Sequence, residues 1–313
     1  MRVNLETGSS ILQDKQQVYR SVSLFKWLVT VAELAKIKIT IFVAFTSALG
    51  FILAADSLST SMILPVSGIF LLACSSAVIN QIQEWQYDAV MKRTMNRPIP
   101  TNKITLTNAW VIAVSLFVIA VSMLIFASNI LTIAVSLLTM VWYNLIYTPL
   151  KRKTGVAIIP GSFVGALPPL AGWLAAGGSL FDTQIWILFS LFFLWQIPHF
   201  WLLLILFKDD YKAASFPVFT DSVSVSTLEK LIIATTLLTS GIAIFYAFTG
   251  AMNYFPSQLV IVAFSVFLAI NSFSINGNHG NRKRVVASFL AINFFTLIFI
   301  TILILDKLLK IIL

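Results

Sequence analysis

The stretch Asn80-Gln-Ile-Gln-Glu84-Trp-Gln-Tyr-Asp88-Ala-Val-Met-Lys92-Arg93-Thr-Met-Asn-Arg97-Pro98 begins inside an apolar run, residues 62–82, that is long enough to cross a membrane. Asn80, Glu84 and Asp88 are spaced four residues apart, so a continuing helix places them on one face, about 6 Å apart per step. Oxygen ligands followed closely by basic side chains can hold a divalent cation and a phosphorylated substrate together. Mixed charges at a helix end can also serve solubility alone.

The composition places the chain in lipid. Hydrophobic residues make up 58% of its 313 residues and charged residues 11%, whereas soluble domains average about 25% charged residues. The single cysteine, Cys74, excludes a disulfide framework and a paired-cysteine metal site. A net charge of +9 would suit nucleic-acid binding, but membrane topology explains the distribution of this charge better.

Nine apolar runs approach the roughly 20 residues that cross a hydrocarbon core. They cover approximately residues 37–55, 62–83, 106–126, 130–148, 156–176, 184–206, 229–249, 256–274 and 285–305. With nine spans, nineteen of the 21 Lys and Arg residues fall on one side, and only Lys307 and Lys310 fall on the other. An even number of spans would scatter this asymmetry. The sequence therefore predicts an all-α integral membrane protein with nine transmembrane helices.

The charge asymmetry also predicts an orientation. By the positive-inside rule, the N-terminus and the basic loops are cytoplasmic and the C-terminus lies outside. Residues 1–30 are polar and lack the apolar core of a secretory signal. We expect a cytoplasmic tail over 1–30 and a single transmembrane domain over 31–313. A bacterial inner membrane fits better than a mitochondrial one, because presequences are poor in acidic residues and this tail is not.

A second acidic group follows the sixth run, in Lys208-Asp209-Asp210-Tyr211-Lys212, on the same predicted side as Glu84 and Asp88. Asp221 follows in the same connection. Two adjacent carboxylates at the end of a helix oppose its dipole and need compensation, which favours cation binding. A solvated loop start is the simpler alternative.

The sixth run contains Trp195-Gln196-Ile-Pro198-His199-Phe200. Burying a histidine in an apolar span without a partner is costly, so His199 is predicted to face a cavity.

The fifth run carries Gly161 and Gly165 at a spacing that allows close helix contact, followed by Pro168 and Pro169. Proline at membrane depth is tolerated where the helix lines a cavity. Tight packing explains the glycines equally well.

Three blocks of sequence together resemble a known family. They are Asn80…Asp88…Met91-Lys-Arg93-Thr94…Asn96-Arg97-Pro98; Tyr143-Asn144…Tyr147-Thr148…Leu150-Lys151-Arg152…Thr154 with Gly161…Gly165…Pro168-Pro169…Gly172-Trp173; and Trp195-Gln196-Ile-Pro198-His199-Phe200 with Lys208-Asp209-Asp210-Tyr211…Pro217. The chain resembles the UbiA superfamily of intramembrane prenyltransferases and, within it, the protohaem IX farnesyltransferases (haem O synthases). It departs from their first motif, N-x-x-x-D-x-D-x-D, by carrying Glu84 and Gln86 at the first two acidic positions.

The resemblance implies a nine-helix bundle around a central cavity, in which a farnesyl group passes from farnesyl diphosphate to a vinyl group of haem B. It also implies the site residues. Mg²⁺ would be held by Asn80, Glu84, Asp88, Asp209 and Asp210, and the diphosphate by Arg93, Arg97, Lys151, Arg152 and Lys208. His199, Trp195 and Gln196 would contact the haem, His199 as an axial ligand or a propionate contact. A haem A synthase or an oxidase-assembly protein is an expected partner.

Two other functions stay open at this point. One is prenyl transfer to a quinone precursor or another aromatic acceptor, which would bind no haem. The other is a transporter that couples ions to the acidic residues. A transporter would carry charges near the membrane midplane and repeated halves, whereas here the acidic residues cluster at one surface and no repeat is evident.

Overall fold

Apolar runs determine the architecture, because a backbone in lipid must satisfy its own hydrogen bonds and a helix does so within one segment. The computed structural model describes residues 24–57, 59–217, 223–277 and 281–313, and within these ranges all regular structure is helical. The main helices are α2 Leu24–Leu34, α3 Ile37–Ala54, α4 Ile63–Asp88, α5 Leu106–Ala127, α6 Ile130–Val141, α7 Thr148–Leu150, α8 Ile158–Ala175, α9 Thr183–Leu206, α10 Lys208–Ala213, α12 Val225–Ala247, α13 Phe255–Ser272 and α14 Arg282–Ile312.

The predicted number of membrane spans is confirmed. The described part of the chain contains nine helices, or continuous helical segments, that are long and apolar enough to cross a membrane, and each overlaps one predicted run. The predicted and observed bounds differ most for the second span and for the last span. The second span continues to Asp88, and the last span runs over Arg282–Ile312. Asn80, Glu84 and Asp88, which we call the polar ladder, therefore all lie within α4 rather than in a loop behind it.

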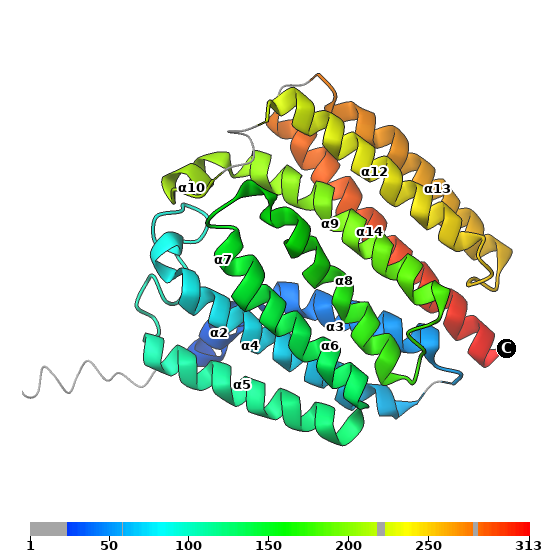
Figure 1. The fold of residues 1–313 in the computed structure, drawn as a ribbon, viewed down its shortest axis with the longest axis horizontal. Coiled ribbons are helices and arrows are strands. Elements are labelled where there is room, and N and C mark those ends of the chain that lie inside the picture. The colour runs from blue at the N-terminus through cyan, green and yellow to red at the C-terminus, as the bar shows by residue number, and fades with distance from the viewer. Residues whose placement is uncertain (1–23, 58, 218–222, 278–280) are drawn as a thin grey trace, which may run out of the picture.

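The spans run roughly side by side (Figure 1). α5 lies at one edge of the bundle, and α12 and α13 lie at the other (Figure 1). The last helix, α14, packs against both α3 and α9, so the last membrane span lies beside the first. α7, α10 and the connection between α4 and α5 gather at one end of the bundle (Figure 1). Connections rich in basic residues thus meet at a single end, as the charge asymmetry predicts.

α3 and α8 approach each other unusually closely. A Cβ added to Gly172 would lie 1.8 Å from the carbonyl oxygen of Ser47, and one added to Gly50 would lie 1.9 Å from that of Pro169. Only glycine allows two backbones to come this near. α8 continues through Pro168 and Pro169 without a break in its helical assignment.

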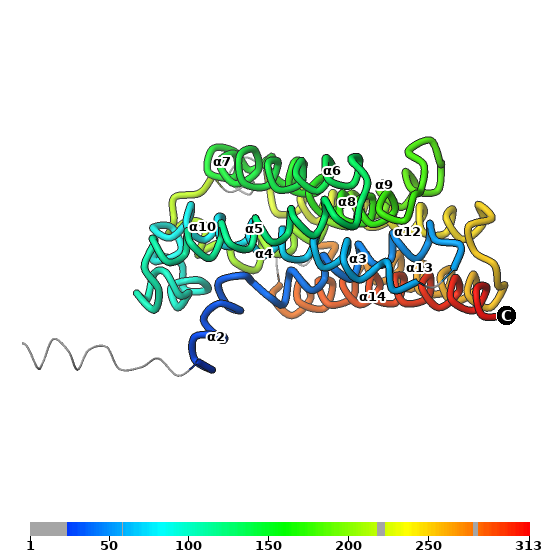
Figure 2. Tube along the Cα trace, turned by 90° about the horizontal axis from the view of Figure 1, so that it is seen from below, coloured from blue at the N-terminus to red at the C-terminus, as the bar shows by residue number. Residues whose placement is uncertain are grey.

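A short helix precedes the first span. Of the tail predicted over 1–30, residues 1–23 lie outside the described residues, and the remainder forms the beginning of α2. α2 projects away from the layer that holds α3 and α14 (Figure 2). Between α2 and α3, Lys36 adopts a left-handed backbone conformation with φ 51° and ψ 48°. This conformation is unfavourable for a residue with a Cβ and marks a sharp turn.

The fourth span changes its helical pitch near its end. α6 passes into a π-helix, Trp142–Tyr147, before α7 begins at Thr148. π-helical turns often occur at functional sites, and this one carries Tyr143, Asn144 and Tyr147.

Candidate active site

A cavity of about 560 Å³ lies within the bundle, lined by α3, α4, α6, the π-helix, α8 and α9. Its volume falls in the usual range for ligand pockets, about 300–1,000 Å³. A second cavity, between α9, α12, α13 and α14, holds only about 10 Å³, which is room for one water. The larger cavity is therefore the candidate substrate site.

The cavity has a polar end and an apolar end. Along α4 its lining changes from Ile69 and Leu72 to Asn80, Glu84 and Asp88. At 1.5 Å per residue, the lining residues of α4 extend over about 28 Å. On α8 the lining begins at Gly161 and ends at Ala171, and Ala171 packs in one apolar cluster with Ile69 and Leu72. These three residues close the end of the cavity farthest from the charged groups.

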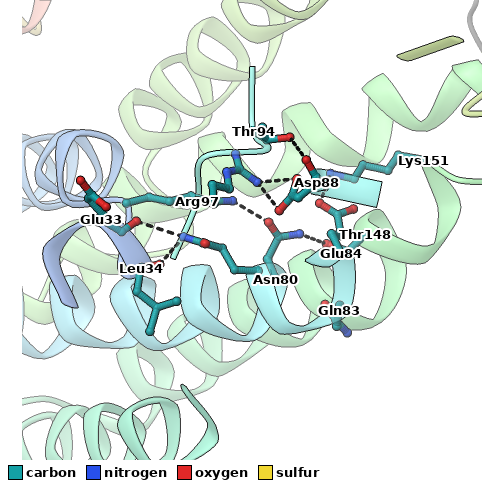
Figure 3. Close-up of polar contacts among 12 residues, drawn as sticks. Glu33, Leu34, Asn80, Gln83, Glu84, Asp88, Thr94, Arg97, Thr148 and Lys151 are labelled. Carbon is teal, nitrogen blue, oxygen red and sulfur yellow. Dashed lines mark hydrogen bonds and ion pairs between the residues drawn. The ribbon is translucent and has the colours of Figure 1, made fainter. Parts of the chain in front are cut away.

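The predicted ladder on α4 forms the polar wall (Figure 3). The side chains of Asn80, Glu84 and Asp88 are buried, with exposed fractions of 1%, 3% and 1%, yet all three line the cavity. Ladder residues are four apart, so each helical turn brings the next one to the same side. The sequence interpretation of this face agrees with the geometry.

Each ladder residue is paired with a different cation. Arg97 Nη1 donates to both carboxylate oxygens of Asp88, at 2.8 and 2.7 Å. Lys151 Nζ donates to Glu84 Oε2 at 2.7 Å. Lys36 Nζ donates to Asn80 Oδ1 at 2.5 Å.

The amide group of Asn80 is held at both ends, because its Nδ2 donates to Thr148 Oγ1 at 3.0 Å. The other Glu84 oxygen, Oε1, is buried and accepts no hydrogen bond among the described residues. Arg152 Nε lies 3.9 Å from it. One carboxylate oxygen at the polar end thus has no hydrogen-bond partner among the described residues.

The two lysines at this end titrate differently. Burial, helped by the nearby charges of Arg97 and Lys151 and opposed by the acids, lowers the pKa of Lys36 to about 7. Burial also disfavours the charged form of Lys151, but the Glu84 carboxylate outweighs it, so the pKa of Lys151 is raised. Lys151 therefore remains a permanent cation, whereas Lys36 can exist in both forms near neutral pH.

Gln86, the departure from the family motif, does not belong to the ladder. It is exposed, whereas Glu84 and Asp88 on either side are buried. Two residues correspond to about 200° of rotation around a helix, so Gln86 lies on a different face from its neighbours in the motif. Its missing charge leaves the polar wall of the cavity unchanged.

Of the remaining predicted diphosphate ligands, all of them described residues, only Arg93 lines the cavity. Its guanidinium lies 4.6 Å from the ring centroid of Phe207. Arg152 Nη2 donates to the carbonyl oxygen of Gln83 at 2.6 Å. Arg152 and Lys208 are not among the described residues that line the cavity.

The second acidic group occupies the same end of the bundle but has a different role in this structure. Asp210 accepts hydrogen bonds from the backbone N–H groups of Lys92 and Arg93, each at 3.2 Å. Asp209 is exposed, and neither aspartate is among the described residues of the cavity lining. Asp210 thus fastens α10 to the loop that follows α4. Asp221 lies outside the described residues.

The predicted haem contacts lie along α9. Trp195, Gln196 and His199 all line the cavity. Trp195 Nε1 donates to the carbonyl oxygen of Ile292 at 3.1 Å, which fixes the indole against α14. His199 Nδ1 and Gln196 Oε1 are buried and have no hydrogen-bond partner among the described residues. Unsatisfied polar atoms facing a cavity are the atoms a ligand would satisfy.

Gly161 and Gly165 make room for side chains. A Cβ on Gly161 would lie 2.6 Å from the ring of Tyr147, and one on Gly165 would lie 1.9 Å from the amide nitrogen of Gln196. The spacing of these two glycines therefore shapes the cavity wall, and the close backbone contact of α8 is made by Gly172 instead.

Sequence reasoning missed several residues of the polar end. Lys36 lines the cavity because the left-handed turn aims it there, and no sequence pattern announces such a turn at a lysine. Tyr143 and Tyr147 also line the cavity. Both belong to the Tyr143…Thr148 block of the family resemblance, but that block did not show what either tyrosine does.

The residues present fit Mg²⁺, on condition that a substrate completes its shell. No cluster of three or more His, Cys, Asp or Glu side chains that could hold a metal occurs in the described ranges. Mg²⁺, however, is usually bound through one or two carboxylates together with waters and substrate phosphates. The carboxylates of Glu84, whose Oε1 is unpaired among the described residues, and Asp88, together with the amide oxygen of Asn80, supply the protein part of such a shell.

Comparisons with known proteins agree with this architecture. The family model of the UbiA prenyltransferase family matches residues 43–299. A protoheme IX farnesyltransferase of Christiangramia forsetii is 33% identical over 287 residues, which cover 89% of this chain and 93% of that protein. A protoheme IX farnesyltransferase of Oleidesulfovibrio alaskensis is 35% identical over 187 residues, 60% of this chain. This second match spans just under two thirds of its relative's length, 66%.

A solved structure has the same fold. It is a UbiA homologue from Archaeoglobus fulgidus bound to DMAPP and Mg²⁺, and it superimposes with a TM-score of 0.67 at 13% identity. The superposition covers 88% of this chain and 99% of that one.

Proposed function

Because the chain belongs to the UbiA prenyltransferase family, we propose that it transfers the farnesyl group of farnesyl diphosphate to a vinyl group of haem B, which yields haem O. The names of the relatives, protoheme IX farnesyltransferases, support this choice of donor and acceptor. The observation that carries the proposal is one cavity within the bundle with paired charges at one end and an apolar lining at the other.

The polar end suits a diphosphate. Lys36, Arg97 and Lys151 surround the ladder within hydrogen-bond distance. In a buried site, fixed cations stabilise charge that develops on a leaving group far more than they would in water. Arg97 and Lys151 would hold the diphosphate oxygens as the bond to the prenyl carbon breaks. Arg93 would add a further positive charge.

Mg²⁺ bound by Asn80, Glu84 and Asp88 would supply further neutralisation of the diphosphate charge. The Mg²⁺ of the Archaeoglobus fulgidus UbiA homologue supports a divalent cation in this family. Asp209 and Asp210, expected as further ligands, would have to leave their present positions to join this set.

The apolar part of the cavity suits the prenyl chain. The cavity also presents the rings of Phe42, Tyr143, Tyr147 and Phe200. Aromatic faces stabilise a cation through their quadrupoles. The carbon–oxygen bond of farnesyl diphosphate breaks and the diphosphate departs with the electron pair. The vinyl group then donates its π electrons to the new carbon–carbon bond, and water adds to the adjacent carbon and loses a proton.

His199 is the residue we assign to the haem. Its Nδ1 is buried without a partner, and the rings of Trp195 and Phe289 lie at centroid distances of 5.2 and 4.9 Å. Gln196 offers a second unsatisfied acceptor on the same helix. An imidazole and flat apolar rings together suit a porphyrin.

The direct test is an assay of membranes that contain the protein, supplied with haem B, farnesyl diphosphate and Mg²⁺. We expect a farnesylated haem in the mass spectrum of the haem pool and a loss of this product in Asp88→Ala. A wild-type protein that makes no farnesylated haem contradicts the proposal. Haem retention by the purified protein, lost in His199→Ala, separates haem from a quinone precursor as the acceptor.

The chain is a multi-pass membrane protein. We further place it in a bacterial inner membrane, with the polar end of the cavity and the N-terminus on the cytoplasmic side and the C-terminus outside. Residues 31–313 would form one prenyltransferase domain behind a cytoplasmic tail. A haem A synthase or an oxidase-assembly protein would receive the product.

A further inference from the structure

Each of the three ladder residues accepts a hydrogen bond from one of the protein's own cations, although Glu84 Oε1 accepts none among the described residues. Asp88 is held by Arg97 and Glu84 by Lys151, both residues that the sequence motifs contain. The third cation, Lys36, comes from outside those motifs and donates to Asn80 Oδ1. A metal on the ladder has to share or replace these contacts.

The chain positions Lys36 by local means. Its left-handed backbone separates α2 from α3. Gln81, the neighbour of Asn80 on α4, donates through Nε2 to the carbonyl oxygens of Glu33 and Leu34, at 3.0 and 2.7 Å. These two bonds fasten the end of α2 to α4. The amine of Lys36 is thereby delivered to the ladder in spite of its unfavourable backbone conformation.

The charge of the cavity lining adds a second argument. Five basic side chains line it, Lys36, Lys38, Arg93, Arg97 and Lys151, against two acidic ones, Glu84 and Asp88. A lone divalent cation entering this excess of positive charge is repelled, whereas a diphosphate is attracted. The ladder is therefore poor at binding a metal by itself.

We propose that Lys36 is a substrate-binding residue that holds the Asn80 oxygen in the metal-free protein and moves its ammonium group to the diphosphate when the metal is bound, so that metal and diphosphate bind interdependently. This inference rests on the proposed function, because it takes the diphosphate as substrate. If a metal binds to the ladder without a diphosphate, Lys36, Lys151 and Arg97 lose their partners on the ladder and gain no new ones. With a diphosphate, each of them gains phosphate oxygens.

Such coupling is reciprocal, because a single coupling free energy changes the affinity of each ligand when the other is bound. Pyrophosphate should therefore tighten metal binding by the same factor by which metal tightens pyrophosphate binding. Lys36 contributes to this factor in both directions. It weakens the binding of metal alone and strengthens the binding of the diphosphate.

The test is equilibrium dialysis of the purified full-length protein in nanodiscs against radiolabelled Mn²⁺, with and without inorganic pyrophosphate. Dialysis reports protein-bound metal at a known free concentration, so complexes formed in solution do not disturb the result. For wild type we expect weak binding of Mn²⁺ alone and at least about tenfold tighter binding with pyrophosphate, within the usual range of coupling between sites.

Lys36→Met should bind Mn²⁺ alone about tenfold more tightly than wild type and gain correspondingly less from pyrophosphate. Lys38→Met is the matched control, because Lys38 lines the same cavity and has the same charge but lies two residues along the chain. Lys36→Gly is the second variant, since glycine suits a backbone with φ 51° and removes the amine without strain. Lys36→Arg should restore the wild-type pattern.

Equal changes in Lys36→Met and Lys38→Met would overturn the inference, because the cavity charge alone would then explain them. Unchanged metal binding in Lys36→Met and Lys36→Gly would overturn it too, as would a wild type that binds no Mn²⁺ with pyrophosphate. The dialysis contains no haem, so coupled binding together with a negative haem assay would reject the proposed acceptor and leave the coupling intact.

Discussion

Asp88 and Gln86 show how strongly one helical position decides the role of a side chain. They are two residues apart, yet Asp88 is buried against Arg97 at the cavity while Gln86 is exposed. The chemistry of the polar end therefore depends on the face of α4 and on which cation reaches it. Glu84, with its longer side chain, still meets Lys151.

This difference predicts opposite outcomes for two substitutions. Asp88→Asn keeps the size of the side chain but removes its charge, so we expect farnesylated haem to form about 100-fold more slowly, as when a charge-stabilising group is lost from an active site. Gln86→Asp restores the acid of the family motif, yet it should change the rate by less than about twofold, because surface charges contribute little. Initial rates in membranes with matched protein levels give the comparison. A large gain from Gln86→Asp would contradict the assigned faces of α4.

A single residue, Ala171, sets the depth of the cavity. It is the lining residue of α8 farthest from the charged end, and it packs with Ile69 and Leu72. Ala171→Phe should fill this end, so that geranyl diphosphate is used in preference to farnesyl diphosphate. Product masses from the two donors, offered in competition, measure the preference. Ala171→Ser, which adds little volume, should keep the farnesyl preference, and an unchanged preference in Ala171→Phe would place the chain end elsewhere.

At the scale of elements, helices are joined by contacts of backbone as well as side chains. α3 and α8 form one wall of the cavity, and their approach depends on Gly50 and Gly172, each of which faces a carbonyl oxygen of the other helix. A carbonyl cannot move aside as the tip of a flexible side chain can. The separation of these two helices is thus fixed by the absence of two methyl groups.

We expect Gly172→Ala to destabilise the protein by about 1–3 kcal/mol, the usual cost of overpacking, and to lower Tm by several degrees. Gly241→Ala on α12 is the matched control, since nothing lies within 4 Å of its added Cβ. It should leave Tm unchanged or raise it slightly, because alanine favours helix over glycine. Thermal unfolding in one detergent, followed by circular dichroism, compares both variants with wild type. Equal Tm values for the two variants would argue against the close approach of α3 and α8.

At the scale of the whole molecule, the order of helices brings distant sequence together. Asp210 reaches the backbone of Lys92 and Arg93, and α14 packs against α3. The Asp210 contacts hold α10 beside the loop that follows α4, and the packing of α14 places the last span beside the first. The polar end is thus assembled from connections that the positive-inside rule assigns to one side of the membrane.

That assignment can be tested by labelling introduced cysteines. The native Cys74 is buried, with 2% of its surface exposed, and should give little background. Lys103→Cys, at the end with the basic connections, should react with a membrane-impermeant maleimide only after spheroplasts are opened. Phe181→Cys, on a connection at the other end and 98% exposed, should react in intact spheroplasts. The reverse pattern would invert the proposed orientation, and labelling of both from one side would contradict the number of spans.

Local features of this protein could be predicted from its sequence, whereas features that depend on tertiary structure could not. The spans and the ladder follow from composition and from a four-residue spacing, which are local properties. Lys36 could not be predicted, because its place in the site depends on a left-handed turn held by Gln81. The backbone contacts of Asp210 also depend on tertiary structure. The sequence shows only that Asp209 and Asp210 are adjacent, and from this pair we predicted a metal ligand.

The six π-helical residues Trp142–Tyr147 set the rotational phase of everything that follows them in the fourth span. A wider turn holds one residue more than an α-helical turn, so the same residues wound as a regular α-helix would rotate Lys151 by about 100° relative to α6. Lys151 would then point away from Glu84, although no residue of the site had been changed. The pitch of this segment is therefore as important to the polar end of the cavity as the side chains that it delivers.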